Sequence, residues 1–209
     1  ASNEPKLTPA ERERQRKDKA RSKDLDRENQ DHHNSEQAIN KLLLLGAGES
    51  GKSTLFKQMI TIYGTGFPEH ERVTYEPIIF NNIIMSMQTL VAAAPQHGGP
   101  VRCKESLEIV RDLPQDTPIN QSNVRHFKAL WLDPGIQKAF ENRSKFQLTD
   151  SAKYFFDKLD TIATQGYIPS EQDVLRSRVR TTGIVENNFE IDGNKFKMFD
   201  VGGQRNERK

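Results

Sequence analysis

The residues from Gly46 to Ser53 have types and a spacing that can do chemistry. The run Gly46-Ala-Gly-Glu-Ser-Gly51-Lys52-Ser53 satisfies the pattern G-x-x-x-x-G-K-[ST] of a phosphate-binding loop. Its glycines let backbone N–H groups approach a polyphosphate without obstruction by side chains. Lys52 would extend along the phosphates toward the terminal one. The Ser53 hydroxyl would ligate a Mg²⁺ ion shared with those phosphates.

The segments on either side of this loop are those that a phosphate-binding loop requires. Leu42 to Leu45 is a continuous apolar run that predicts a short strand, buried and covered on both faces. The run from Thr54 to Ile60 predicts a helix whose N-terminal dipole points at the same anion. A glycine-rich turn that meets the pattern by accident is the alternative, and the flanking strand and helix argue against it.

A second group of candidate residues lies near the end of the chain, where the apolar period changes to two. From Ile184 onward, alternating apolar residues flank Asp192-Gly193, which predicts a β-hairpin. Its second strand ends at Asp200, which is followed by glycines. In phosphoryl-transfer folds this position supplies a second carboxylate to the magnesium site. Alone, Asp200 would be an ordinary turn residue, and only its combination with the phosphate-binding loop favours the magnesium role.

The stretch between the loop helix and about residue 171 has helical periodicity and no convincing strand, so it predicts an inserted all-helical domain. Pro77 should mark the first turn of one long helix or a kink in it. Three apolar stripes predict core-facing helices. They are Phe80, Ile84, Met87, Val91 and Ala94; Val124, Phe127 and Trp131; and Ala152, Phe155, Leu159 and Ile162.

Composition limits the remaining possibilities. Residues 1–40 carry equal numbers of acidic and basic side chains and almost no apolar ones, which predicts a polar helix or a disordered arm. The net charge of the chain is only +2, so bulk electrostatics do not indicate a nucleic-acid partner. No run of 18 uninterrupted apolar residues exists, and we therefore expect no membrane span. The first residues, Ala1-Ser-Asn-Glu, contain no lipidation motif.

Three motifs together resemble the α subunit of heterotrimeric G proteins: GAGESGKST, DVLRSRVRTTGI at 173–184, and FDVGGQRNERK at 199–209. The resemblance covers nearly the whole chain. It implies an α/β fold of the P-loop NTPase (Ras-like) class, a GTPase domain with an inserted all-helical domain. The expected parts are an N-terminal arm at 1–38, GTPase segments at 39–64 and 173–209, and the helical domain at 65–172.

The resemblance also implies roles for individual residues. Arg178 would be a built-in arginine finger, with Arg180 as a rival, and Gln204 would orient the attacking water. Ser53, Thr181 and Asp200 would hold Mg²⁺, Asp200 through water. The nucleotide GTP or GDP would be bound by Glu49, Ser50, Gly51, Lys52, Ser53, Thr54, Asp150, Ser151, Leu175, Arg176, Thr181, Asp200 and Gly203, with the Gly203 N–H on the γ-phosphate.

The function implied by the resemblance is that of a GTP-hydrolysing molecular switch, which couples a membrane receptor to effectors from the inner face of the plasma membrane. Its partners would be the βγ dimer, a G-protein-coupled receptor and a downstream effector. Membrane association would be peripheral, through these partners or a lipid. One alternative is a non-hydrolysing α-subunit fragment that acts as a βγ-binding module. A phosphate-loop ATPase or kinase of another family is a third reading, which leaves the matches at Arg178, Thr181 and Gln204 unexplained.

The chain departs from the family pattern by what it lacks. The Asn-Lys-x-Asp segment that selects guanine is not found, and Asn40-Lys41-Leu-Leu is its nearest echo. Only the hairpin strands are available to pair with Leu42–Leu45, so one edge of that strand should be exposed. We therefore expect a truncated α subunit without the C-terminal half of the GTPase sheet, or a partner that covers the edge.

Overall fold

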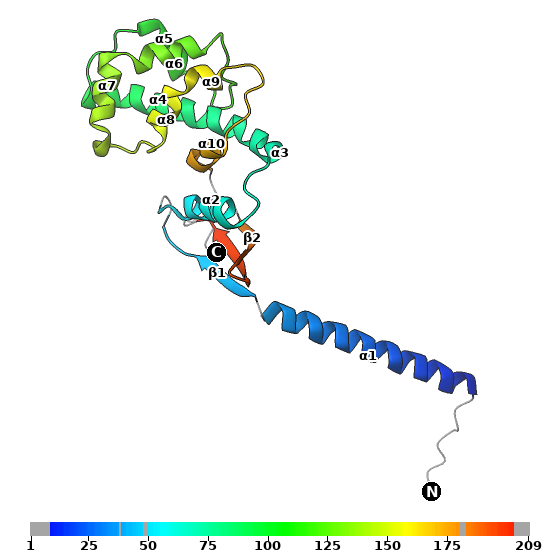
Figure 1. The fold of residues 1–209 in the computed structure, drawn as a ribbon. Helices are drawn as coiled ribbons and strands as arrows, with labels where there is room; N and C mark the ends of the chain where they lie inside the picture. Colours follow the sequence, from blue (N-terminus) through cyan, green and yellow to red (C-terminus); the bar gives the residue numbers. More distant parts are fainter. Residues whose placement is uncertain (1–8, 38, 48–49, 180–182, 203–209) are drawn as a thin grey trace.

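The computed structural model describes residues 9–37, 39–47, 50–179 and 183–202. In these residues the apolar side chains form two separate buried clusters, one in a bundle of helices and one between a helix and a small sheet. Figure 1 shows the helical bundle at one end and the sheet with α2 (Lys52–Tyr63) nearer the middle. Both clusters matter for the site, because its residues come from both parts of the chain.

The sheet has three strands: β1 (Asn40–Leu44), β2 (Ile184–Ile191) and β3 (Asn194–Val201). Their order is β1-β3-β2, with β1 parallel to β3 and β2 antiparallel to it. A small core of Phe56, Phe189 and Met198 holds α2 against the hairpin. Because β3 lies in the centre, the phosphate-binding loop that follows β1 is brought beside the end of β3.

The predicted strand is present, but its predicted burial is wrong for the described residues. Leu42 and Leu43 are 38% and 55% exposed, and Leu45, just after the strand, is 76% exposed. The reason is that β1 lies at the edge of the sheet and pairs only with β3. The expectation of an exposed apolar edge is thereby confirmed.

The predicted hairpin is confirmed at the predicted turn. Asp192 and Gly193 have φ values of 49° and 77°. Positive φ at both central residues is the requirement of the tight turn whose twist matches that of the flanking strands. The eight cross-strand pairs run from Ile184 opposite Val201 to Ile191 opposite Asn194.

The bundle consists of helices joined by turns and loops, and its described residues contain no strand, as the sequence predicts. Its elements are α3 (Glu69–Arg72), η1 (Val73–Tyr75), α4 (Glu76–His97), α5 (Lys104–Arg111), α6 (Val124–Trp131), α7 (Pro134–Glu141), η2 (Arg143–Lys145), α8 (Ala152–Asp157) and α9 (Leu159–Ile162), and they are followed by α10 (Glu171–Arg176). The third stripe therefore spans two short helices rather than one. Its four apolar members are all buried.

Helix α4 runs through the middle of the bundle, and every residue of the first predicted stripe on it is buried. Pro77 lies in its first turn, one of the two expected places, and the helix ends at His97 with Gly98 as its C-cap. The segment Glu69–His97 is long and apolar enough to cross a membrane by length and composition, with a mean hydropathy of 1.4. However, 56% of that apolar window is buried inside the bundle, so packing in the core accounts for its apolar character.

The N-terminal region forms α1 (Pro9–Gln37), which extends away from the sheet and the bundle (Figure 1). Of the two readings left open by the sequence, helix or disorder, the structure gives a helix for these residues. Lys17 and Glu13 form an ion pair one turn apart, of the kind that supports an exposed helix.

Candidate functional site

The phosphate-binding loop contains glycines that serve two different structural purposes. A Cβ atom at Gly46 would lie 2.5 Å from Ser50 Oγ, so a side chain here would require the Ser50 hydroxyl to move. Gly51 has a φ of 86°, which favours glycine, and it immediately precedes α2. Lys52 donates hydrogen bonds to the carbonyl oxygens of Gly46 and Ala47 at 3.1 and 2.9 Å, which keep its ammonium group over the loop.

The Ser53 hydroxyl donates a hydrogen bond of 2.7 Å to Asp200 Oδ2. The two residues are brought together by the sheet, because Asp200 on β3 pairs with Leu44, shortly before the loop on β1. Asp200 is only 2% exposed. The two positions that the sequence analysis assigned to magnesium from residue types therefore lie in contact, although they are 147 positions apart.

A hydroxyl and a carboxylate at this separation form a donor set that suits Mg²⁺, which prefers hard oxygen ligands and binds with few protein groups plus phosphate oxygens. Among the described residues no cluster of three or more His, Cys, Asp or Glu side chains lies close enough to hold a metal ion by itself. The set therefore fits an ion that is shared with a polyphosphate on the loop.

The segment that follows α10 carries Arg178. The chain leaves the helix at Ser177, which is extended (φ −66°, ψ 139°) and buried. Leu175 is half-buried and Arg176 exposed, with the Arg176 guanidinium 4.6 Å from the ring centre of Tyr154 on α8. The Arg178 side chain is exposed, whereas its backbone is hydrogen-bonded to α4, as described below.

Asp173 anchors α10 to the bundle. Its carboxylate accepts hydrogen bonds from Lys158 Nζ at 2.7 Å, from the Tyr154 and Tyr167 hydroxyls at 2.7 and 2.9 Å, and from the Ser170 backbone N–H and hydroxyl at 2.8 Å. Burial alone would raise the pKa of this carboxyl group. The hydrogen bonds, led by the one from Lys158, outweigh burial and lower the pKa of Asp173 to about 2.

Of the other residues predicted to bind the nucleotide, some lie in the part of the chain that the structure describes and others lie outside it. Ser50 and Thr54 are exposed in and just after the loop. Asp150 is exposed, and Ser151 is the N-cap residue of α8, which lies within the helical bundle in Figure 1. The predictions for Glu49, Arg180, Thr181, Gly203 and Gln204 fall outside the described residues.

Two residues of the site region were missed by the sequence analysis. Lys57 on α2 is buried and donates hydrogen bonds to the carbonyl oxygens of Val174 and Ser177. Asn82 on α4 is also buried and hydrogen-bonds the backbone of Arg178. Neither position carried a signal in the sequence, since Asn82, two residues after Phe80, falls on the side of its helix away from the predicted stripe.

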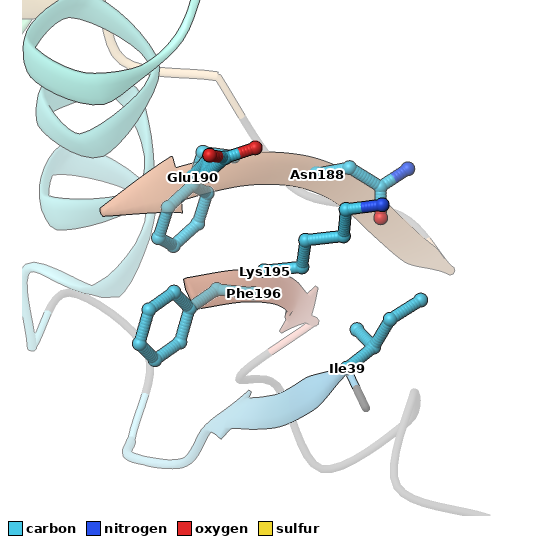
Figure 2. Close-up of a pocket in the computed structure, with 6 residues that line it drawn as sticks. Ile39, Asn188, Glu190, Lys195 and Phe196 are labelled. Carbon is cyan, nitrogen blue, oxygen red and sulfur yellow. The ribbon is translucent and has the colours of Figure 1, made fainter. Parts of the chain in front are cut away.

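An open hollow of about 290 Å³ lies elsewhere, at the end of the hairpin remote from Asp200. It is lined by Ile39, Asn188, Phe189, Glu190, Lys195 and Phe196. Figure 2 shows Ile39, beside the start of β1, across the opening from the hairpin side chains. The lining is mainly apolar, with stacked rings of Phe189 and Phe196, and none of these six residues belongs to the phosphate-binding loop.

The strand, glycine loop and helix, with a carboxylate from the neighbouring strand and an inserted helical bundle, define a P-loop NTPase fold with a helical domain. The family described as "G-protein alpha subunit" matches residues 15–209, and the chain belongs to this family. It is 43% identical over 176 residues to the proteins named guanine nucleotide-binding protein G(o) subunit alpha from Locusta migratoria, Lymnaea stagnalis and Planorbella trivolvis. The matches cover 81% of this chain and 50% of each relative. The chain thus spans about half the length of the curated relatives it matches.

Proposed function

We propose that this chain binds guanine nucleotide as part of a heterotrimeric G-protein α subunit and takes part in Mg²⁺-dependent hydrolysis of GTP. The observation that carries the proposal is the 2.7 Å contact between Ser53 and Asp200, which puts two magnesium-type ligands beside a phosphate-binding loop in a member of this family. The names of the similar proteins support guanine as the base.

The proposed binding mode follows from the loop. Its backbone N–H groups, from Glu49 to Thr54, hold the phosphates together with the Lys52 ammonium group. Ser53, Thr181 and Asp200 would hold a Mg²⁺ ion beside these phosphates. When bound, the ion neutralises negative charge on the phosphate oxygens. Asp150, Ser151, Leu175 and Arg176 flank the nucleotide.

The proposed hydrolysis depends on three further side-chain and backbone groups. The Arg178 guanidinium stabilises the charge that develops on the γ-phosphate oxygens, which needs positioning but no covalent step. Gln204 orients the attacking water. The Gly203 N–H contacts the γ-phosphate and so responds to its presence or loss.

We also propose a domain organisation and binding partners for this chain. Residues 39–64 and 173–209 form the GTPase part, 65–172 the helical domain and 1–38 the N-terminal arm. The proposed partners are the βγ dimer, a G-protein-coupled receptor and an effector, at the inner face of the plasma membrane. The long α1 and the two separate cores support this division.

Single-turnover hydrolysis of GTP with Mg²⁺ tests the proposal. Arg178→Ala should bind GTP as tightly as wild type but hydrolyse it about 10³- to 10⁵-fold more slowly, the range established for arginine fingers in this class of enzyme. Arg111→Ala, which removes an exposed arginine paired with Asp112 on α5, is the matched control and should keep the wild-type rate. Hydrolysis by Arg178→Ala at the wild-type rate would remove Arg178 from this role. Equal hydrolysis of ATP and GTP by the wild type would contradict the choice of base.

A further inference from the structure

The backbone of Arg178 is held by the side chain of one residue from a distant helix. Asn82 Nδ2 donates a hydrogen bond of 3.0 Å to the Arg178 carbonyl oxygen, and the Arg178 N–H donates one of 2.6 Å to Asn82 Oδ1. Both polar groups of this backbone unit are therefore bound by one carboxamide. Asn82 lies on α4 and is buried.

The residue before Arg178 is held from a different helix. Lys57 Nζ donates hydrogen bonds to the Ser177 carbonyl oxygen at 2.8 Å, to Ser177 Oγ at 3.1 Å and to the Val174 carbonyl oxygen at 2.9 Å. Lys57 belongs to α2, the helix that begins at the phosphate-binding loop. Two consecutive residues, Ser177 and Arg178, are thus fixed to the loop helix on one side and to the bundle on the other.

These contacts matter because α10 has already ended here. Ser177 is extended, and the residues from 177 to 179 belong to no helix or strand. Hydrogen bonds within a regular element therefore cannot fix the position of Arg178. A displaced backbone would carry the guanidinium with it, and electrostatic stabilisation of a transition state requires charges that are fixed in advance to within about 0.5 Å.

We propose that Asn82 is a positioning residue for Arg178, which acts by fixing the backbone from which the guanidinium reaches the γ-phosphate, while Lys57 fixes the preceding residue. The proposal rests on the function proposed above, since it assigns Asn82 a role in the same reaction. A side chain that merely satisfied buried polar groups would affect stability alone. A positioning residue affects the rate of hydrolysis, and only when Arg178 is present.

A double-mutant cycle on single-turnover GTP hydrolysis distinguishes these roles. Asn82→Ala should slow hydrolysis about 10- to 100-fold, as expected for a misplaced catalytic group, and leave the affinity for GTP unchanged. In the Arg178→Ala background the same substitution should have no further effect, because the group it positions has gone. Asn81→Ala is the matched control. This neighbour on α4 hydrogen-bonds the Gln115 carbonyl oxygen instead, and its loss should leave the rate unchanged. Equal slowing by Asn82→Ala in both backgrounds, or no slowing in either, would overturn the proposal.

A second readout separates failure of this proposal from failure of the proposed function. If wild type does not hydrolyse GTP, the proposed function fails for this chain, and amide hydrogen exchange then decides whether Asn82 holds Arg178. The Arg178 amide should exchange about tenfold faster in Asn82→Ala, the factor expected for loss of one hydrogen bond. Asn82→Asp keeps the acceptor and should retain the protection, as should Asn81→Ala. An Arg178 amide that exchanges equally fast in wild type and Asn82→Ala would overturn the proposal without any nucleotide.

Discussion

Lys57 Nζ lies 2.8 Å from the Ser177 carbonyl oxygen, although the two residues are 120 positions apart in the chain. This contact joins the helix of the phosphate-binding loop to the segment that carries Arg178. The Lys57 ammonium group is buried, and burial lowers its pKa from 10.5 to about 8. The connection between the two parts of the site therefore depends on an ionisable group with a displaced pKa.

The displaced pKa of Lys57 predicts how stability changes in alkaline solution. Between about pH 8 and 10.5 the unfolded chain keeps a proton that the folded chain releases, so the free energy of unfolding should rise with pH across this range. Below pH 8 both states are protonated, and the cost of burying the charge is fully present. Relative to Lys57→Met, wild type should gain about 3 kcal/mol across the range.

Urea unfolding of both proteins at several pH values checks this prediction, since the titration of all other groups cancels in the difference. Lys41→Met, which removes an exposed lysine from β1, is the control. The difference in unfolding free energy between wild type and this variant should not rise in the same way with pH. A difference between wild type and Lys57→Met that stays constant or falls with rising pH would contradict it.

The lowered pKa of Asp173 predicts that stability is lost in acid. Its pKa is lowered from 3.8 to about 2, so its contribution to stability is fully present above pH 3.8 and is lost as pH falls to about 2. Asp173→Asn should lower the free energy of unfolding by about 2 kcal/mol at neutral pH. The two proteins should converge in stability as the solution is acidified.

Acid titration followed by circular dichroism measures this convergence for Asp173. The matched control is Asp160→Asn, since Asp160 pairs with Lys128 at the protein surface, where an ion pair contributes little. If Asp173→Asn were no less stable at neutral pH than Asp160→Asn, the anchoring role of Asp173 would be wrong.

Where the end of α4 meets α7, two adjacent glycines should differ in how well they tolerate replacement by alanine. A Cβ atom at Gly98 would overlap the Gly135 carbonyl oxygen and lie 3.0 Å from Ala139 Cβ, whereas one at Gly99 would meet no atom within 4 Å. Gly98→Ala should therefore destabilise the chain by about 1 to 3 kcal/mol, as overpacking does. Gly99→Ala should leave the melting temperature almost unchanged. Similar melting temperatures for the two variants would show that the helices do not approach this closely.

The parts of the fold that the sequence predicts are those encoded over short stretches. The loop from Gly46 to Ser53 and the turn at Asp192-Gly193 depend on local backbone requirements, so their residue types alone indicate them. The stripe from Phe80 to Ala94 predicts α4 because apolar residues at helical spacing need a core. Burial of Leu43 could not be predicted in the same way, because it depends on which strands lie beside β1.

The residues of the site likewise fall into those that the sequence indicated and those that it did not. The sequence indicated Ser53 and Asp200 as magnesium ligands, because each residue has a recognisable position relative to a strand. Asn82 and Lys57 could not be assigned partners, since those partners lie 96 and 120 positions away and are backbone atoms that leave no mark in the sequence. Buried polar groups need partners, but the predicted apolar stripes indicated neither the burial of these two residues nor their partners.

The magnesium dependence of GTP binding tests the central claim most directly. Equilibrium binding of GTP to the 209-residue chain should be measured with and without Mg²⁺, for wild type, for Ser53→Ala and for Thr61→Ala as a control near the far end of α2. Mg²⁺ should raise the affinity of wild type and of Thr61→Ala for GTP, and Ser53→Ala should lose this increase. Absence of GTP binding by wild type, or an increase that survives in Ser53→Ala, would contradict the assignment of a magnesium and phosphate site to Ser53 and Asp200.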